Sequence, residues 1–397
     1  MKIRRGFKYR LEPTPEQRQK FAQFAGACRS VYNKILSMNN ARYEPARFNL
    51  HTPRINYNDS AGLLKLWKQS DEDGWLKETD SQVLQQALRD LDQAYTNLFA
   101  GRTQAPTCRK KFLNDSFRYP QRFEVERNQV KLPKIGWVTF KRHRPIIGEI
   151  KHVTVSRKGE HWFVSFQTEC EVDEPIHPSP TPVGIDMGIA KFATLSTGKP
   201  YEPLNSFRKH EAKLAKEQGK LAQQIKFSNR WRIRQGRIGR LHTKIANCRH
   251  DYLHQVSSEI SKNHAVVVLE DLKVSTMSRS ARGTIEQPGR RVAQKSGLNK
   301  SILDQGWSRF RHMLEYKQAW AGGMVITVPP QYTSQTCAEC GCVDSHSRPT
   351  QGRFSCIHCG HTDNADVNAA RNILAVGLTD RINARLGEKS SSEAQVL

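Results

Sequence analysis

The sequence predicts an α/β domain that carries a metal-binding insertion, preceded by a part built from short strands and helices. Three observations indicate this class. Two apolar strands of the kind found in buried parallel sheets each carry an acidic residue. Two CxxC pairs follow them, and a series of short alternating segments precedes them. A chain of 397 residues is long enough for two or three domains with a sizeable core.

The first hundred residues combine one strand with helices. Residues 2–11 mix basic and apolar side chains and predict a short strand. Thr14 to Gln17 form a capping box with proline at the first helical position, so a helix begins there. A second helix is predicted over Ser81–Phe99 and a short one near Leu63–Gln69. We expect the two longer helices to pack together as a small helical domain.

Short alternating runs between residues 116 and 168 predict a β-barrel or a curled sheet. The runs are 117–119, 129–132, 136–140, 151–155 and 161–166. We expect the first strand of the chain to close this sheet. The stretch Glu171–Pro182, with four prolines and three acidic residues, has the composition of a linker.

The second half begins with a predicted β-hairpin and a long basic segment. Val183–Gly188 is a short apolar strand with one acid, and residues 191–196 return beside it. Residues 206–248 predict a hairpin of two helices with 12 Lys or Arg residues against only Glu211 and Glu217. Because a merely solvated helix face carries both signs of charge, this bias favours a surface that follows phosphates.

The remaining elements alternate between strand and helix. Ala265–Leu272 opens with a continuous apolar run and predicts a buried strand, parallel to its neighbours. The Ser-, Arg- and Gly-rich stretch Met277–Lys300 predicts a mobile segment. Further predictions are a helix over Ile302–Trp320, a strand over Met324–Val328, a helix over Asn368–Leu374 and a disordered tail over Glu388–Leu397.

Two CxxC pairs near the C-terminus predict a zinc site. The pairs, with 15 residues between them, are Cys337/Cys340 and Cys356/Cys359. Each pair puts two thiolates on one tight turn, and two such turns close the four-thiolate cage that Zn²⁺ prefers in structural sites. The alternatives are unrelated reduced pairs or a redox disulfide. Three nearby side chains could substitute as ligands, although the two pairs already fill the cage: Cys342, His358 and His361.

Three acidic residues stand where an unpaired carboxylate is costly. Asp186 lies on one apolar strand, Glu270 ends another, and Asp366 lies near the start of a helix. An Arg or Lys partner within the fold explains either strand acid taken alone. Together the three can converge on one sheet edge, where hard oxygen ligands suit Mg²⁺ or Mn²⁺.

Composition limits the cellular setting and the partner. The chain has 63 Lys plus Arg against 38 Asp plus Glu, a net charge of +25 that indicates a polyanionic partner. Nine cysteines without a wider pairing pattern fit a reduced, intracellular setting. The N-terminus lacks the apolar run of a signal peptide, and no 18-residue apolar stretch occurs. We therefore expect a soluble, cytoplasmic, nucleoid-associated protein with no membrane partner.

The motifs resemble those of TnpB, also called OrfB, the transposon-encoded RNA-guided nuclease related to type V CRISPR effectors. The resemblance rests on Gly184–Gly188, Val267–Leu272 and the cysteine pairs followed by Asp366–Ala370. Weaker landmarks occur in the family's order at residues 9–14, 116–120 and 132–136. The resemblance covers nearly the whole chain. The length of the chain and its full set of family motifs favour the transposon class over a compact CRISPR effector.

The resemblance implies an RNase H-like (RuvC) fold with a zinc-ribbon insertion, in which Asp186, Glu270 and Asp366 match the three acidic motifs. It implies Mg²⁺ or Mn²⁺, two per active site, and one structural Zn²⁺. The implied partners are a guide RNA from the transposon end and double-stranded target DNA next to a short flanking motif. Asp363 is the second choice to Asp366, because the family's Asp-x-Asn-Ala-Ala pattern selects Asp366, and Asp271 is the second choice to Glu270.

The resemblance also implies a division into domains. Residues 1–12 and 106–180 would form a wedge-like β-barrel, 13–105 a helical recognition domain, 181–330 and 361–380 the nuclease, 331–360 a zinc-binding insertion that contacts target nucleic acid, and 381–397 a disordered tail. The insertion could help to load the single strand or could act only as a clamp on Asp366. Two rival functions use the same parts: a DNA strand-transferase, and a non-cleaving nucleic-acid binder or repressor.

Overall fold

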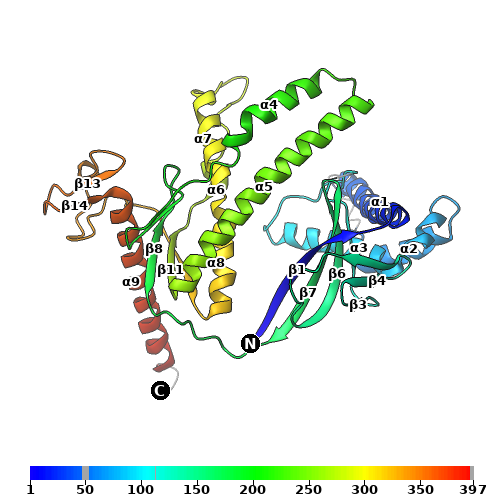
Figure 1. Ribbon diagram of the computed structural model, residues 1–397, viewed down its shortest axis with the longest axis horizontal. Helices are drawn as coiled ribbons and strands as arrows, with labels where there is room; N and C mark the ends of the chain where they lie inside the picture. The colour runs from blue at the N-terminus through cyan, green and yellow to red at the C-terminus, as the bar shows by residue number, and fades with distance from the viewer. Residues whose placement is uncertain (47–52, 112, 394–397) are drawn as a thin grey trace. The chain divides into compact units, whose positions relative to one another are not determined.

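The computed structural model describes residues 1–46, 53–111 and 113–393 (Figure 1). Contacts between Cα atoms divide the chain into two compact units, Met1–Asp173 and Glu174–Leu397. The division falls within the predicted linker Glu171–Pro182. Each unit is described by itself.

The first unit contains one seven-stranded antiparallel sheet in the order β2-β6-β7-β1-β5-β4-β3. Its strands are β1 (Lys2–Glu12), β2 (Ser116–Tyr119), β3 (Glu124–Glu126), β4 (Gln129–Leu132), β5 (Gly136–Phe140), β6 (Glu149–Lys158) and β7 (His161–Glu171). Strand β1 pairs with β7 as far as Arg10 and then with β5 at Leu11 and Glu12. The first strand therefore joins the two halves of a curled sheet. Among the described residues, no hydrogen-bonded pair joins the edge strands β2 and β3, so the predicted barrel is not closed by backbone pairing.

Helices α1 (Pro15–Ala46), α2 (Tyr57–Gln69) and α3 (Ser81–Phe99), with the 3-10 turn η1 (Gly74–Glu78), complete this unit. The predicted capping box is confirmed: the N–H of Gln17 donates to Oγ1 of Thr14 (3.3 Å), and the N–H of Thr14 donates to Oε1 of Gln17 (3.0 Å). Helix α2 begins earlier than predicted because Asn56 caps it. The apolar faces of α1 and α3 share one core with the sheet.

The second unit is built on a five-stranded sheet in the order β10-β9-β8-β11-β12. The strands are β8 (Pro182–Asp186), β9 (Ala193–Leu195), β10 (Pro200–Tyr201), β11 (Val266–Glu270) and β12 (Met324–Val328). Strands β8, β11 and β12 are parallel, whereas β9 and β10 run antiparallel as hairpins. The predicted hairpin after β8 and the predicted parallel pairing of β11 are both confirmed. The β-branched run of β11 is buried along its whole length, as a central parallel strand requires.

Helices cover both faces of this sheet. They are α4 (Arg208–Ala222), α5 (Asn229–Asn263), α6 (Val274–Met277), α7 (Val292–Gln305), α8 (Trp307–Ala321) and α9 (Ala365–Glu393). Val267 and Leu269 face a core shared with α5 and α8, whereas Val266 and Val268 face Ile373 of α9. Successive side chains of β11 therefore face two different helical layers. These layers lie on opposite sides of β8 and β11 in Figure 1. Helices α4 and α5 form the predicted hairpin and extend beyond the sheet.

Two predictions for this unit were wrong. Helix α7 occupies part of the segment predicted to be mobile, Met277–Lys300. The single helix predicted over Ile302–Trp320 is two helices, because Gly306 between them takes the left-handed conformation at φ 76°. The bounds of helix α9 reach Glu393, the disorder predicted for residues 381–397 stays a prediction, and residues 394–397 lie outside the described residues.

The cysteine segment between β12 and α9 is short and mostly irregular. It contains the 3-10 turn η2 (Ser345–Ser347) and the hairpin of β13 (Arg353–Ser355) with β14 (Thr362–Asn364). Among the helices that the structure describes, none is both long enough and apolar enough to span a membrane.

Candidate active site and metal centre

The parallel pairing of β8 and β11 brings two of the predicted acids to one sheet edge. Ile185 is in register with Leu269, and Asp186 and Glu270 follow them at the carboxyl ends of the strands. Only 8% of Glu270 is exposed. Asp186 is half-buried. Two adjacent carboxylates with so little exposure are costly unless a cation or a proton compensates them.

Helix α9 brings the third acid, Asp366, to the same strand end. Oδ1 of Asn364 accepts hydrogen bonds from the N–H groups of Asp366 (3.0 Å) and Val367 (3.3 Å), which caps the helix. The helix then lies directly against β8 at Gly184, where an added Cβ would come 2.1 Å from the carbonyl oxygen of Ala370. Glycine at this position therefore allows the close approach that places the first turn of α9 beside Asp186.

The three carboxylates lie near enough for their charges to interact. Burial, and then the negative charges of Glu270 and Asp366, raise the pKa of Asp186 to about 7, while the positive charge of Arg348 opposes the shift. Burial also raises the pKa of Glu270, and a hydrogen bond from the Thr333 hydroxyl to Oε1 (2.6 Å) opposes that shift. An all-oxygen donor set with excess negative charge suits a hard divalent cation.

The two alternative acids are engaged elsewhere. Oδ1 of Asp271 pairs with Nη1 of Arg311 at 2.6 Å, and Oδ2 of Asp363 pairs with Nη1 of Arg371 at 2.9 Å. Each of these carboxylates therefore has the arginine partner that a purely structural acid needs. Asp366 also lies 3.5 Å from an arginine, Arg348, so this contrast separates Glu270 from Asp271 but does not separate Asp366 from Asp363.

The four predicted zinc ligands lie together. The sulfur atoms of Cys337, Cys340, Cys356 and Cys359 are all within 4.8 Å of one another. The N–H of Cys359 donates to Sγ of Cys356 (3.5 Å) and lowers the pKa of that thiol, which favours the thiolate that a metal binds. Four sulfur donors at this spacing fit a structural Zn²⁺. The alternative ligands Cys342, His358 and His361 are not part of the cluster.

Two buried asparagines join the cysteine segment to the helix of Asp366. Asn368 accepts from the N–H of Ala338 (2.9 Å) and donates to the carbonyl of Thr336 (2.8 Å). Asn372 donates to the carbonyls of Thr333 (2.9 Å) and Thr336 (2.7 Å). Asn368 therefore holds the first CxxC turn against α9. This contact explains why an asparagine stands two residues after Asp366 in the Asp-x-Asn pattern.

Comparison with known proteins decides the family. The chain is 50% identical over 379 residues to a protein of Escherichia coli (strain K12) named "Putative RNA-guided DNA endonuclease InsQ", covering 95% of this chain and 93% of that one. The chain belongs to the TnpB (OrfB, IS605) family. A Streptomyces pristinaespiralis family member named "Putative RNA-guided DNA endonuclease" is 34% identical, covering 95% of this chain and 90% of that one.

Family models match three parts of this TnpB-family chain. They are described as "Helix-turn-helix domain" for residues 1–47, "Probable transposase" for 165–281, and "Cas12f1-like, TNB domain" for 307–373. Among solved structures, a cryo-EM Cas12f1-sgRNA-target DNA complex matches at a TM-score of 0.35 and 17% identity, covering 94% of this chain and 99% of that one. A cryo-EM structure of CasPhi-2 (Cas12j) bound to crRNA matches at a TM-score of 0.40 and 11% identity, covering 95% of this chain and 98% of that one.

The sequence reasoning missed two residues at the site of this family member. Nη2 of Arg348 lies 3.5 Å from Oδ1 of Asp366, and Thr333 holds Glu270. Arg348 lies in an irregular stretch between the two CxxC pairs and Thr333 in the loop after β12, so neither has a periodic pattern around it. The signal that could have indicated them is their position within the segment that the four cysteines tie to Asp366.

Proposed function

We propose that this chain is a transposon-associated, RNA-guided DNA endonuclease that hydrolyses phosphodiesters next to a short flanking DNA motif. The observation that supports the proposal is that Asp186 and Glu270 end adjacent parallel strands and that the charge of Asp366 also acts on Asp186. The names of its relatives support the RNA-guided reading. The parallel β8-β11-β12 core flanked by the β8-β9-β10 hairpins supports an RNase H-like (RuvC) fold for the catalytic domain.

The three carboxylates would hold Mg²⁺ or Mn²⁺, two ions per site. Bound there, the ions would supply an activated water for in-line attack and would stabilise charge on the leaving 3′ oxygen. The hydrogen bond from Thr333 orients the Glu270 carboxylate and opposes the rise of its pKa on burial. Arg348 adds one positive charge beside Asp366, where it can contact a non-bridging oxygen of the scissile phosphate. The products would carry a 5′ phosphate and a 3′ hydroxyl.

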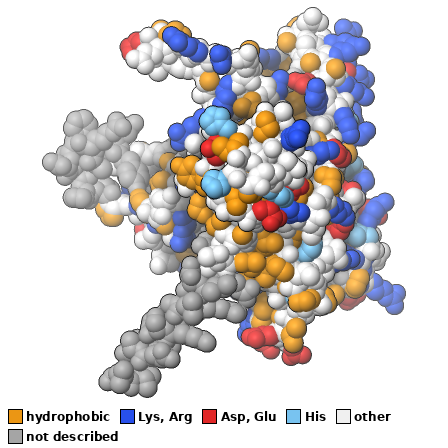
Figure 2. Space-filling model, turned by 90° about the vertical axis from the view of Figure 1, so that its left-hand side faces the viewer, with side chains coloured by type: hydrophobic (Ala, Val, Ile, Leu, Met, Phe, Trp, Pro, Cys, Tyr) orange, Lys and Arg blue, Asp and Glu red, His pale blue; other side chains and the backbone are white. Residues whose placement is uncertain are grey.

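A basic surface supports an RNA and DNA partner. The hairpin of α4 and α5 carries most of the one-sided charge of residues 206–248, and Lys and Arg side chains outnumber Asp and Glu on the face that Figure 2 shows. Such a surface binds phosphates without reading sequence, so base pairing with a guide would supply specificity. We assign the flanking motif and the heteroduplex to the strands and helices of residues 1–180, and we assign strand loading or clamping to residues 331–360.

The deciding experiment sequences the RNA that copurifies with the protein from cells that carry the native locus. Cleavage of a plasmid in Mg²⁺ is then compared between wild type and Asp186→Ala. A discrete RNA whose variable end directs cutting, lost in the variant, supports a guided nuclease. Cutting that ignores the RNA sequence supports an unguided nuclease, joined DNA ends support a strand-transferase, and target binding without cutting supports a repressor.

Arg348→Ala should lower the cleavage rate by about 100-fold, because one positive group beside a phosphoryl transition state contributes several kcal/mol. Arg348→Lys should recover part of the rate by keeping the charge without the planar fork. Single-turnover cleavage at saturating Mg²⁺ measures both. Arg353→Ala, an exposed arginine in the same segment, is the matched control, and equal rate losses for Arg348→Ala and Arg353→Ala would contradict a role specific to Arg348.

Thr333→Val should raise the Mg²⁺ concentration needed for half-maximal cleavage several-fold. The substitution keeps the shape of the side chain but removes the hydroxyl that opposes the raised pKa of Glu270, so protons compete better with the metal. The deficit should shrink at pH 9, where Glu270 is deprotonated in both proteins. Thr333→Ser keeps the hydroxyl and serves as the control, and a deficit that is unchanged at pH 9 would contradict the argument.

Replacing Arg230, Arg232 and Arg237 of α5 together with Gln should weaken RNA binding. All three side chains are exposed. Each phosphate contact that is lost should lower the slope of log K against log salt by about 0.7 to 0.9. Filter binding of the copurified RNA between low and moderate salt gives that slope. A matched variant exchanges exposed Lys2, Lys65 and Lys158, which lie outside α5, for Gln. The same loss of slope in that variant would show that the loss of charge matters and that its position on α5 does not.

A further inference from the structure

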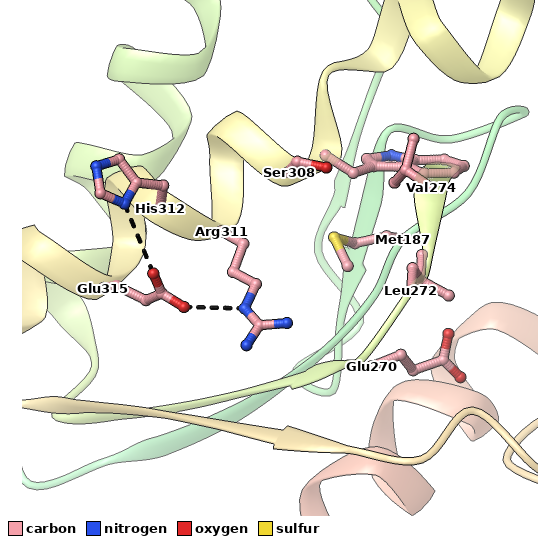
Figure 3. Close-up of a pocket in the computed structure, with 9 residues that line it drawn as sticks. Met187, Glu270, Leu272, Val274, Ser308, Arg311, His312 and Glu315 are labelled. Atoms are coloured by element: carbon pink, nitrogen blue, oxygen red, sulfur yellow. Dashed lines mark hydrogen bonds and ion pairs between the residues drawn. The ribbon is translucent and has the colours of Figure 1, made fainter. Parts of the chain in front are cut away.

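A pocket of about 260 Å³ opens beside Glu270, on the side of the sheet that α8 covers (Figure 3). Its apolar lining comes from the segments that follow β8 and β11 and from the start of α8. The residues are Met187, Leu272, Val274 and Trp307. Glu270 itself lines the pocket, so the pocket adjoins one of the three carboxylates from the α8 side of the sheet. It therefore offers an apolar surface next to the place proposed for the scissile phosphate.

One apolar wall carries an unsatisfied donor. Trp307 is only 3% exposed, and its Nε1–H has no hydrogen-bond partner among the described residues. A buried N–H without a partner is costly and is normally satisfied in a protein's functional state. Trp307 also lines the pocket and contributes to its apolar wall.

The opposite wall is polar and held in place by ion pairs. Arg311 donates from Nε to Oε1 of Glu315 (2.9 Å) and from Nη1 to Oδ1 of Asp271 (2.6 Å). His312 pairs with Oε2 of Glu315 at 3.7 Å. Figure 3 shows the Arg311 guanidinium directed to the space between α8 and Glu270. Donors and acceptors are thus fixed along one edge of an otherwise apolar cavity.

The charges decide what kind of group fits. Asp271 and Glu315 pair with Arg311, and Glu270 lines the same pocket, so a phosphate there would meet carboxylates on more than one side. A neutral ring avoids that repulsion and uses both the apolar wall and the polar edge. The volume lies just below the range of about 300–1,000 Å³ for drug-sized ligands, so it admits one flat ring system and not a base pair.

From these contacts we infer that the pocket binds one unpaired nucleobase of the strand being cut, at the nucleotide next to the scissile phosphate. The inference rests on the proposed nuclease function and extends it to substrate positioning. A base can enter only when its strand is unpaired at the cut. Stacking on the apolar wall and hydrogen bonds at the polar edge hold the nucleotide while its phosphate lies at the carboxylates. This placement fixes which phosphate is cut.

Photocrosslinking tests the pocket without requiring cleavage. The ribonucleoprotein is bound, in Ca²⁺, to targets that carry a single 5-iodo-2′-deoxyuridine, walked base by base through the cut region. After irradiation, one position adjacent to the cut should crosslink to the peptide that contains Trp307. Ser308→Trp, which fills the pocket from an exposed lining position, should abolish that crosslink. Ala319→Trp adds the same side chain at an exposed α8 position outside the pocket and should retain it.

Cleavage of matched targets in Mg²⁺ gives the second readout. An abasic site at the crosslinking position should slow wild-type cleavage on the order of ten-fold, as expected for the loss of one stacked base. Ser308→Trp should cut intact and abasic targets at the same reduced rate. Base binding in the pocket would be refuted if wild type cut every abasic target at the same rate, or if no crosslink formed to the Trp307 peptide. Cleavage in the same assay would still support the proposed nuclease function. A position-specific crosslink without any cleavage would support the pocket and reject the nuclease.

Discussion

Asp186→Asn should abolish guided DNA cleavage, with a rate loss of at least about 1,000-fold, or roughly 4 kcal/mol of transition-state stabilisation. The amide keeps the shape of the side chain but removes one of the three charges that would hold the metal ions. RNA binding should be unchanged, because Asp186 lies at a strand end within the second unit and carries no positive charge. Single-turnover cleavage together with RNA pull-down measures the two properties separately.

The same substitution should stabilise the metal-free protein. The folded-state pKa of Asp186, about 7, lies above its ordinary value of 3.8. The stabilising contribution of the protonated carboxyl is therefore fully present below pH 4 and is lost as pH rises through 7. The amide of the variant does not ionise, so the gain over wild type should grow with pH to roughly 2–4 kcal/mol above pH 7. Thermal unfolding in EDTA at pH 5 and pH 8 tests this.

Asp363→Asn is the matched control for both measurements. It removes one negative charge near the same strand end, but from a carboxylate that Arg371 already pairs. Cleavage should fall only slightly, and the metal-free stability should not rise with pH. A loss of cleavage in Asp363→Asn comparable to that in Asp186→Asn would transfer the metal site to the alternative acid. If Asp186→Asn and wild type had the same melting temperature at pH 8 without metal, the argument that burial and nearby carboxylates destabilise charged Asp186 would be wrong.

The parts of the site that could be predicted are those in regular, buried elements. An acid in an apolar strand is unusual enough to be noticed, and Asp186 and Glu270 are two such acids. Their proximity then follows from parallel pairing, because the carboxyl ends of parallel strands meet at one edge. The cysteine cluster was predictable for a similar reason, since ligand spacing within each CxxC is fixed by one tight turn.

The parts that could not be predicted depend on loops and on single conformations. Arg348 and Thr333 lie in irregular backbone, and only the folded cysteine segment places them beside Asp366 and Glu270. The helix predicted over Ile302–Trp320 has continuous apolar periodicity, and the left-handed φ of Gly306 that divides it cannot be read from that pattern. The pocket beside Glu270 also depends on this break, because Trp307 begins the second helix there.

Cys337→Ser should remove one bound zinc per chain and reduce cleavage by at least about 100-fold. Binding of a structural Zn²⁺ contributes about 10–16 kcal/mol to folding of its segment, so an incomplete cage leaves residues 331–360 without their main stabilisation. The damage should reach the active site, because Asn368 and Asn372 are anchored on carbonyl and N–H groups of this segment. Without those anchors, the first turn of α9 that carries Asp366 loses its fixed position.

Cys342→Ser separates this effect from the loss of any thiol in the segment. The carbonyl of Cys342 accepts from the N–H of Cys337 (2.9 Å), but its sulfur is not in the cluster, so zinc content and cleavage should both stay near wild type. Metal content by mass spectrometry and cleavage at saturating Mg²⁺ are measured on the same preparations. Full zinc in Cys337→Ser would refute the four-thiolate cage. Zinc loss with normal cleavage would instead refute the coupling through Asn368 and Asn372, and would leave the cysteine segment as an independent module rather than the clamp that holds Asp366.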